Sequence, residues 1–346
     1  MAEAPRRRAQ LTEPAAPAAA AVMAAFRLAG APTALAPVAG AWSNRLYRLE
    51  TTEGFYAVKE LENPWDEPRF AQRLGAAWRF EQDARAAGIA APEPIPAPGG
   101  ACAISLERPG RGEALVRVHR WVDGVAAPAG PVSADVAGWA GQTLARLHGL
   151  AVAPADRSLF PYTGAATADR WPELVAAARR AGAGWADALE RAGGAVFAIA
   201  DLAAAAAHRP GDEVMSHADF DQRNVLLTPS GPVLCDWDVA SPVVPRCELA
   251  GVALSLGAWV DMDVAREVVR AYRAAGGDAG AFAPPDLGPA LMTGLDWIAL
   301  NVEVALGELP APAWRRERAD GLVSELAASV PGRVQVALDV GAALNA

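Results

Sequence analysis

Between residues 34 and 61, apolar and polar residues alternate, and turn-forming residues interrupt the alternation at Gly40 and at residues 52–54. A period of two places every second side chain on the same face of a strand, so this region predicts three strands. Residues 101–106 and 114–122 have the same character. We therefore expect a small antiparallel sheet in the first third of the chain.

A helical period replaces this alternation elsewhere. Residues 15–28 and 69–87 predict one helix each, and Ala-rich helices are expected over residues 165–207 and from residue 249 onward. After residue 123 the clearest helical face carries Val136, Ala140, Leu144 and Leu147. Glycine and proline predict breaks at Gly182, Gly184, Gly193, Gly194, Gly276, Gly277, Pro284, Pro285, 310–312, Pro331 and Gly332.

The length of 346 residues exceeds that of a typical single domain. We therefore expect an α+β fold of two lobes, namely an antiparallel-sheet lobe over residues 1–122 and a larger, mainly helical lobe over residues 123–346. Residues 1–14 are expected to be flexible. Asp123 and Gly124 mark the crossing between the two lobes.

The most informative chemistry lies between residues 214 and 238. His217, Asp219 and Asn224 have the spacing H-x-D-x-x-x-x-N, and a β-hairpin pattern follows and ends at Asp236. Phosphoryl transfer to an alcohol requires a carboxylate that orients the hydroxyl, plus an amide oxygen and a second carboxylate for Mg²⁺. Asp219, Asn224 and Asp236 supply these groups in that order.

Lys59 is the only lysine among 31 basic residues. It ends an apolar strand pattern, and a compact ammonium is not interchangeable with the wide fork of arginine. In kinases a lysine on the third strand contacts the nucleotide phosphates and pairs with a glutamate of the next helix. Glu81 is the candidate for that partner. The alternative is that Lys59 is a solvated surface charge.

Composition narrows the class of protein. No apolar run is long enough for a membrane span, and prolines interrupt the N-terminal stretch that could be mistaken for a signal peptide. The three cysteines are an odd number in a long chain, which argues against a disulfide framework, and no cysteine or histidine pair has zinc spacing. We expect a cytoplasmic protein, monomeric or homodimeric, with no membrane or nucleic-acid partner.

The ordered motifs resemble the aminoglycoside phosphotransferase and choline kinase family of small-molecule kinases, which share the protein-kinase-like fold. The features that carry the resemblance are residues 40–44, Val58 with Lys59, Glu81, the loop from His217 to Asn224, Asp236 with Trp237, and residues 248–250. The resemblance implies ATP or GTP with Mg²⁺ as cofactors. It also implies that Ser43 and Asn44 cover the phosphates and that the backbone from Arg120 to Val122 contacts the adenine. In the family, the histidine at the position of His217 braces the backbone of its loop.

The distribution of charged residues along the chain indicates the charge of the substrate. Residues 1–150 carry a balance of +1, and residues 151–346 carry −10, which favours a small cationic molecule over nucleic acid. Candidate substrate contacts are Asp221, Asp238, Asp261, Asp263, Asp296, Trp297 and Asn301. Asp221 could instead pair with Arg223, and Asp238 could help to hold the metal, support Asp236 or cap a turn. Asp261 and Asp263 are expected in a loop, and the last three candidates on a helix.

These observations predict an enzyme that moves the γ-phosphoryl group of ATP or GTP to a hydroxyl. An aminoglycoside or a related basic antibiotic is the favoured acceptor, which would make the protein a resistance kinase. Two alternatives stay open. One is a metabolic kinase for choline, homoserine, a sugar or a modified amine, and the other is a catalytically silent nucleotide-binding protein.

Overall fold

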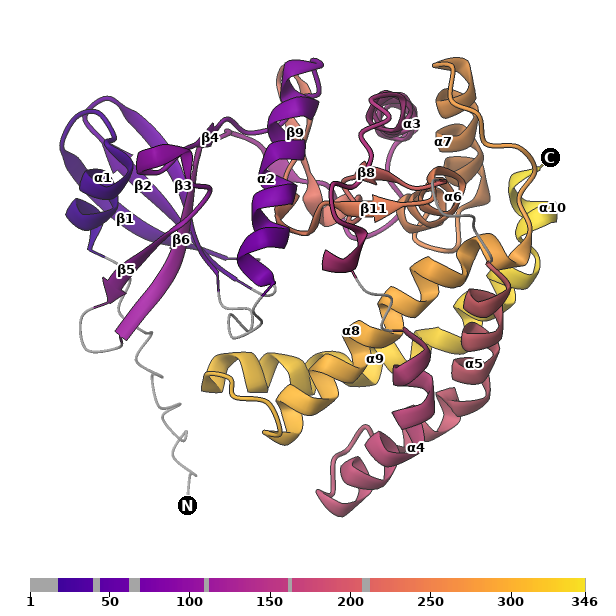
Figure 1. The fold of residues 1–346 in the computed structure, drawn as a ribbon. Coiled ribbons are helices and arrows are strands. Elements are labelled where there is room, and N and C mark those ends of the chain that lie inside the picture. The colour runs from indigo at the N-terminus through magenta and orange to yellow at the C-terminus, as the bar shows by residue number, and fades with distance from the viewer. Residues whose placement is uncertain are drawn as a thin grey trace, which may run out of the picture. The chain divides into compact units, whose positions relative to one another are not determined.

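A computed structural model describes residues 18–39, 44–61, 69–108, 112–160, 164–206 and 212–345. The chain divides into two compact units (Figure 1). The first comprises Met1–Pro68 and Pro92–Val122, and the second comprises Arg69–Ala91 and Asp123–Ala346. The helix α2 (Phe70–Ala86) therefore groups with the second unit, although the chain returns to the first unit after it.

The first unit contains an antiparallel sheet. Its strands are β1 (Pro32–Val38), β2 (Arg45–Thr51), β3 (Gly54–Leu61), β4 (Pro94–Ile95), β5 (Ile104–Arg108) and β6 (Gly112–Arg120). They follow the order β1-β2-β3-β6-β4, and β5 also pairs with β6. The short helix α1 (Ala19–Phe26) buries Val22, Met23 and Phe26 in the core of this unit. The predicted antiparallel sheet is confirmed.

Alternation along β3 separates the two faces of this sheet. Tyr56 and Val58 lie in the core, whereas Lys59 is half-buried and points to the opposite face. The register pairs Lys59 with Leu46 of β2 and with Arg117 of β6. Directly opposed residues lie on the same side of a sheet, so Lys59 and Arg117 share a face.

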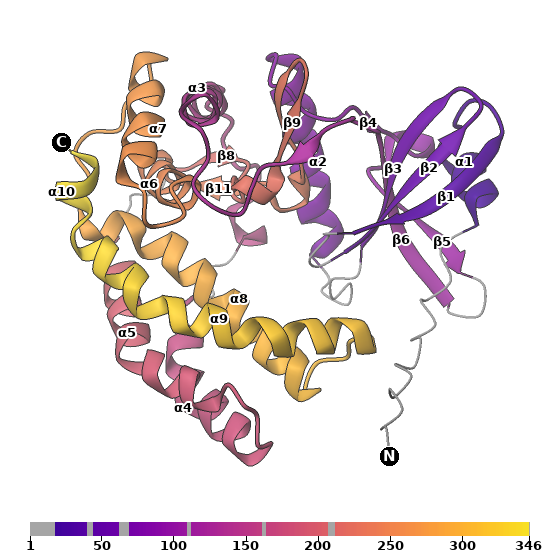
Figure 2. The same cartoon turned by 180° about the vertical axis from the view of Figure 1, so that it is seen from behind.

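The second unit is mainly helical. Its helices are α2, α3 (Ala134–Gly149), α4 (Gly164–Arg180), α5 (Ala186–Ala205), α6 (Pro245–Leu256), α7 (Met262–Ala274), α8 (Gly288–Leu306), α9 (Ala313–Leu338) and α10 (Val340–Leu344). Its strands are β7 (Val125–Ala126), β8 (Val214–Ser216), β9 (Val225–Thr228), β10 (Gly231–Leu234) and β11 (Ser241–Val243). Both views show α4, α5, α8 and α9 side by side (Figures 1 and 2). None of the helices in the described residues is long and apolar enough to cross a membrane.

Close packing of α3 on α7 depends on one glycine. A β-carbon at Gly141 would lie 2.2 Å from the carbonyl oxygen of Val268 and 2.8 Å from the amide nitrogen of Tyr272. Only hydrogen fits at this position, so the backbones of the two helices approach each other directly. Gly141 thereby sets the distance between α3 and α7.

Two predicted breaks are wrong. Gly193 and Gly194 lie inside α5, and Pro331 and Gly332 lie inside α9. In each case a buried apolar stripe continues across the break, through Ala192 and Val196 in α5 and through Val330 and Val334 in α9. Burial of a continuous stripe outweighs the cost of glycine or of an exposed proline in a helix.

Candidate functional site

The candidate site is built on the loop between β8 and β9 and on the residues that follow β10. A single turn of 3₁₀ helix (Gln222–Asn224) precedes β9, and β9 and β10 form an antiparallel hairpin. At the base of the hairpin the amide of Cys235 donates to the carbonyl of Asn224 at 2.8 Å. This bond brings Asp236, the next residue, close to Asn224. The predicted loop and hairpin are therefore present.

Asn224 ties down Asp219. Its side-chain nitrogen donates to the main-chain oxygen of Asp219 at 2.7 Å and to the Oδ2 atom of Asp219 at 2.9 Å. Because the first partner can only accept, the nitrogen of the amide must be the atom that faces Asp219. The Oδ1 atom of Asn224 therefore points away and accepts no hydrogen bond from the described residues.

The electrostatics of Asp219 are unusual for an aspartate. Burial, together with the negative charges of Asp221 and Asp236, raises the pKa of Asp219 from 3.8 to about 7. The charge of Arg223 and the bond from Asn224 oppose this rise. A carboxyl group with a pKa close to neutrality can accept a proton from a reacting hydroxyl and release it again, which suits a general base.

His217 holds the loop as predicted. Its Nδ1 atom lies 3.3 Å from the amide of Asp219, and its Nε2 atom lies 2.8 Å from the carbonyl oxygen of Cys235. The amide can only donate, so Nδ1 accepts and the proton is on Nε2. Burial lowers the pKa of His217, which keeps the ring neutral. The ring also packs edge-on against Trp237, with centroids 4.7 Å apart.

Sequence reasoning missed the support beneath this loop. Ala218 has a φ of 61°, a left-handed conformation that costs an alanine about 1 kcal/mol or more. Its amide donates to Glu248 at 2.8 Å, and a hydrogen bond to a charged group contributes about 1.5–3 kcal/mol. Glu248 appeared in the sequence only as part of the family resemblance. His148 and Tyr272, which lie behind it, come from distant parts of the chain.

The nucleotide candidates fall in both units. Lys59 is half-buried on β3, and Asn44 is buried just before β2. Glu81 is fully buried on α2, in the second unit. Ser43 lies outside the described residues. The pairing of Lys59 with Glu81 stays a prediction.

The segment from Arg120 to Val122 uses part of its backbone internally. The amide of Arg120 donates to the carbonyl of Glu93 at 2.8 Å, and the amide of Trp121 donates to the carbonyl of Phe55 at 3.0 Å. An adenine contact through this segment therefore requires the amide of Val122 or a carbonyl oxygen. That contact stays a prediction.

Two of the candidate substrate contacts, Asp221 and Asp238, follow Asp219 and Asp236 by two residues each. Asp221 is buried and forms an ion pair with Arg223, including a bond of 2.8 Å from the Nε atom, so the alternative role considered for it is the one observed. Asp238 is half-buried on the 3₁₀ turn Trp237–Val239 that follows Asp236. Asp221 therefore lies on the same loop as Asp219, whereas Asp238 lies beyond the hairpin, two residues after Asp236.

Asp261 lies in the loop directly before α7, as expected, whereas Asp263 lies inside the helix, so the expectation is wrong for Asp263. Asp261 caps α7 by accepting the amides of Asp263 and Val264, both at 3.1 Å. Asp263 lies in the first turn, where its exposed side chain pairs with Arg266 at 2.8 Å. A capping aspartate satisfies free amides at a helix start, which explains why α7 begins here.

The three later candidates lie on α8, as predicted. Asp296 accepts a hydrogen bond from Thr167 and so links α8 to α4. Asn301 is buried and donates to the carbonyl of Trp297, one turn earlier, at 2.7 Å. These bonds show structural duties for Asp296 and Asn301. Their contact with a substrate stays a prediction.

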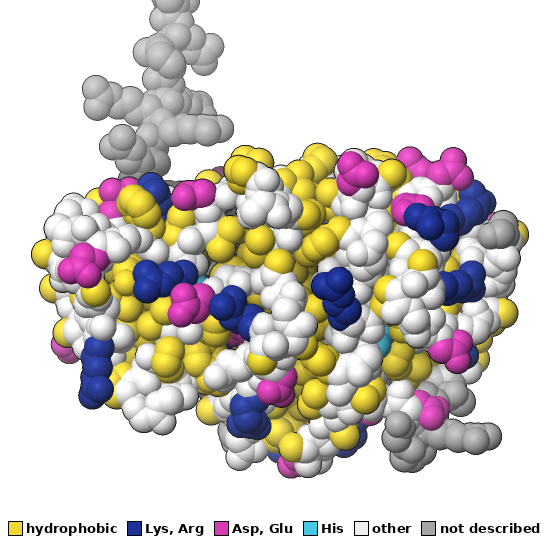
Figure 3. All heavy atoms as spheres, turned by 90° about the horizontal axis from the view of Figure 1, so that it is seen from above, with side chains coloured by type: hydrophobic (Ala, Val, Ile, Leu, Met, Phe, Trp, Pro, Cys, Tyr) yellow, Lys and Arg dark blue, Asp and Glu magenta, His cyan; other side chains and the backbone are white. Residues whose placement is uncertain are grey.

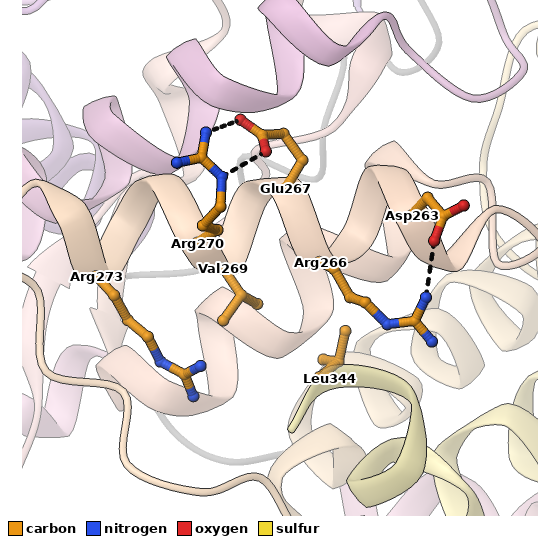
Figure 4. Close-up of a pocket in the computed structure, with 7 residues that line it drawn as sticks. All are labelled: Asp263, Arg266, Glu267, Val269, Arg270, Arg273 and Leu344. Atoms are coloured by element: carbon orange, nitrogen blue, oxygen red, sulfur yellow. Dashed lines mark hydrogen bonds and ion pairs between the residues drawn. The ribbon is translucent and has the colours of Figure 1, made fainter. Parts of the chain in front are cut away.

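A surface hollow of about 310 Å³ lies along α7 (Figure 4). Its lining residues are Asp263, Arg266, Glu267, Val269, Arg270, Arg273 and Leu344. Arg266 and Arg270 already bind acidic neighbours on the same helix, and Arg273 donates to the carbonyl of Gly280. Apart from Asp263, it contains none of the candidate site residues.

Comparison with known families decides the class of this protein. The profile of the phosphotransferase enzyme family matches residues 34–284. The chain belongs to the phosphotransferase enzyme family. The match spans both units and includes the catalytic loop, the hairpin and Glu248. The predicted enzyme class, a phosphotransferase, is confirmed.

Solved structures share the fold of this phosphotransferase. A spectinomycin phosphotransferase in complex with ADP and spectinomycin has a TM-score of 0.62 at 14% identity, over 87% of this chain and 94% of that one. A microcompartment-associated aminopropanol kinase has a TM-score of 0.61 at 14% identity, over 93% and 98%. A choline/ethanolamine kinase family protein from Mesorhizobium loti has a TM-score of 0.54 at 21% identity, over 92% and 97%. No curated protein matches the chain.

Proposed function

We propose that this phosphotransferase moves the γ-phosphoryl group of ATP or GTP to a hydroxyl of a small molecule, with Asp219 as the catalytic carboxylate. The observation that carries the proposal is the double hydrogen bond from Asn224 to Asp219. It fixes the carboxylate and leaves the amide oxygen of Asn224 without a hydrogen bond from the described residues. This is the arrangement of groups that phosphoryl transfer to an alcohol requires.

In the proposed reaction the acceptor oxygen attacks the γ-phosphorus in line with the leaving nucleoside diphosphate. A bond from the acceptor oxygen to phosphorus forms, and the bond to the bridging oxygen between the β- and γ-phosphates breaks. The hydroxyl proton passes to Asp219 and then to solvent. A pKa of about 7 allows Asp219 to take up and release this proton at neutral pH.

The residues fit a magnesium site. The Oδ1 atom of Asn224 and the exposed carboxylate of Asp236 are hard oxygen donors of the kind that Mg²⁺ prefers. The bound ion would neutralise charge on the phosphates. Asn224 and Asp236 would hold it, and Asp219 would stay bound to the amide nitrogen of Asn224.

For the nucleotide, we propose that Lys59 binds the phosphates and that Glu81 orients Lys59. Ser43 and Asn44 would cover the phosphates, and Arg120 and Val122 would contact the base through the backbone. Support comes from the position of Lys59 on the sheet face that also carries Arg117, because two cations on one face favour an anionic ligand.

For the acceptor, we propose a small cationic molecule, with an aminoglycoside or related basic antibiotic as the first candidate. The balance of −10 over residues 151–346 supports this choice. Asp221, Asp238 and Asp296 are candidates for binding amines, and for Asp221 and Asp296 an amine would add to the partners Arg223 and Thr167. On the face drawn in Figure 3, acidic and basic side chains are interspersed, so any steering of cations depends on other surfaces.

One observation favours a metabolic acceptor with an anionic group, such as homoserine. The guanidinium of Arg333 lies over the ring of Trp259 at 5.2 Å and has no ion pair within the described part of the chain. Burial, together with the positive charge of Arg223, lowers the pKa of Arg333. An oxyanion of a ligand would give Arg333 the anionic partner that Arg223 already has in Asp221.

A silent nucleotide-binding protein is the remaining alternative, and the intact set of Asp219, Asn224 and Asp236 argues against it. We further propose a cytoplasmic enzyme, monomeric or homodimeric, with no nucleic-acid or membrane partner. The overall charge of −9 opposes binding to nucleic acid.

The test is a coupled assay of nucleotide consumption across aminoglycosides, other basic antibiotics, choline, homoserine and sugars. The protein should consume nucleotide with one acceptor class, and Asp219→Asn should lower turnover by about 10²- to 10⁴-fold. Thermal stabilisation by the magnesium nucleotide should persist in the variant. Stabilisation by nucleotide without turnover on any acceptor would favour the silent alternative.

A further inference from the structure

The buried carboxylate of Glu248 binds the backbone amide of Ala218, the residue directly before Asp219. The amide of Ala218 donates to the Oε1 atom of Glu248 at 2.8 Å, across 30 residues of sequence. Ala218 is in the left-handed region with a φ of 61°, which an alanine leaves readily unless a neighbour holds it. The next residue in the chain is Asp219, so the conformation of Ala218 sets the direction in which Asp219 points.

Glu248 is itself held by His148, and His148 is in turn held by Tyr272. Its Oε2 atom lies 2.7 Å from the Nε2 atom of His148 on α3, and the Nδ1 atom of that ring lies 2.9 Å from the hydroxyl of Tyr272 on α7. His148 and Tyr272 are buried, and the side chain of Glu248 is 6% exposed. The three residues come from three helices that pack on one another.

With a neutral His148 ring, the hydrogen bonds that link Tyr272, His148, Glu248 and Ala218 have one consistent set of donors and acceptors. The hydroxyl of Tyr272 donates to Nδ1, Nε2 donates to Glu248, and the other oxygen of Glu248 accepts the amide of Ala218. Burial raises the pKa of Tyr272 to about 12, so its hydroxyl keeps the proton at neutral pH. Although burial alone would raise the pKa of Glu248, the bonds from His148 and Ala218 lower it, so the carboxylate stays ionised.

We propose that Glu248, supported by His148 and Tyr272, is a positioning residue for phosphoryl transfer: its carboxylate holds the peptide of Ala218 in the left-handed conformation that aims Asp219 at the acceptor hydroxyl. The inference rests on the proposed role of Asp219. Glu248 touches no reacting atom in this scheme. Its effect is on turnover and not on the binding of nucleotide or acceptor.

The structure supplies a matched control. Asp286 is also a buried carboxylate that accepts one backbone amide, that of Ala283 at 2.8 Å, and one side chain, that of Arg246 at 2.8 Å. Because Arg246 lies in the first turn of α6, two residues before Glu248, Asp286→Ala loosens the same helix without removing a bond to the catalytic loop. Asp286→Ala therefore loses only a buried carboxylate, whereas Glu248→Ala also loses the hydrogen bond to Ala218.

The experiment compares Glu248→Ala, Asp286→Ala and wild type, after circular dichroism has shown that each is folded. Turnover, the KM values and the thermal shift with magnesium nucleotide are measured for each protein. Glu248→Ala should lower kcat by about 100-fold, the size expected for a misplacement of about 1 Å, with KM and the thermal shift almost unchanged. Asp286→Ala should keep kcat close to wild type.

Two further variants distinguish positioning from a general structural role. Glycine adopts a positive φ without strain, so adding Ala218→Gly to Glu248→Ala should recover a large part of the lost kcat. In Glu248→Gln the new amide must donate to Nε2 of His148, which moves the proton of that ring to Nδ1. Nitrogen NMR should show this tautomer change, and kcat should stay within a few-fold of wild type.

If the wild type turns over its acceptor, two results would overturn the positioning role of Glu248. One is an equal loss of kcat in Glu248→Ala and Asp286→Ala, and the other is no recovery of kcat when Ala218→Gly is added to Glu248→Ala. A wild-type protein that phosphorylates no acceptor would instead refute the proposed function, and this inference with it. The two failures are therefore distinguishable.

Discussion

The raised pKa of Asp219 leads to a prediction about stability that needs no substrate. Replacement of Asp219 by asparagine keeps the size of the side chain and removes its charge. In the wild type the carboxyl has a pKa of about 7 when folded, against an ordinary value of 3.8. Between these two pH values the unfolded chain has released the proton and the folded chain has kept it. The stability of the wild type should therefore fall relative to Asp219→Asn as pH rises from 4 to 7.

The size of this effect follows from the two pKa values. Each tenfold change in an acid constant corresponds to about 1.4 kcal/mol. For values of 3.8 and about 7, the difference in unfolding free energy between wild type and variant should change by about 2.6 kcal/mol between pH 5 and pH 8. Because Asp219 is partly exposed, solvent screens its charge, and we expect a measured change of about 1–2 kcal/mol.

The assay is urea denaturation followed by tryptophan fluorescence at pH 5, 6, 7 and 8. Asp201→Asn, at an exposed position on α5, is the control and should differ from wild type by a constant amount. A gap between wild type and Asp219→Asn that does not change over this range would refute the electrostatic account of the loop. Asp219 would then be an ordinary acid without the properties of a general base near neutral pH.

Three further predictions concern other parts of the molecule. Lys59→Arg keeps the charge, yet it should lower kcat/KM for the nucleotide by about tenfold or more in steady-state kinetics, because the guanidinium fork does not fit an ammonium site; wild-type kinetics would mean that Lys59 is a surface charge. If the acceptor is cationic, its KM should increase between about 0.01 and 0.15 M salt, because screening weakens attraction by the acidic second unit, whereas a neutral acceptor should show no trend. Gly141→Ala should destabilise the protein by about 3 kcal/mol, or about 6–12 °C in Tm by calorimetry, because its β-carbon meets the backbone of Val268; Gly138→Ala, which meets only the flexible end of Glu267, should cost far less.

The sequence was most informative where the signal is local. Alternation over three short strands, the H-x-D-x-x-x-x-N spacing and the turn between β9 and β10 each involve residues within a few positions of one another. The structure contains these elements, and the family match confirms the class of enzyme. The ion pair between Asp221 and Arg223 could also be predicted from the sequence, since the two residues are two positions apart on one turn.

What the sequence could not predict depends on contacts between distant residues. His148 and Glu248 are 100 residues apart, and His148 and Tyr272 are 124 apart, so no periodicity connects them. The continuity of α5 through Gly193 depends on the neighbours that bury its apolar stripe. A signal that could have pointed to Glu248 was its place in an otherwise apolar helix, because buried carboxylates need partners.

The central claim is that this protein makes a phosphate ester with Asp219 as the base. The most direct measurement is phosphorus NMR, with mass spectrometry, of the product formed from magnesium nucleotide and the acceptor class that supports turnover. We predict a phosphate monoester on a hydroxyl, formed by the wild type and almost absent with folded Asp219→Asn. A phosphoramidate, or a monoester formed at the wild-type rate by Asp219→Asn, would contradict the account.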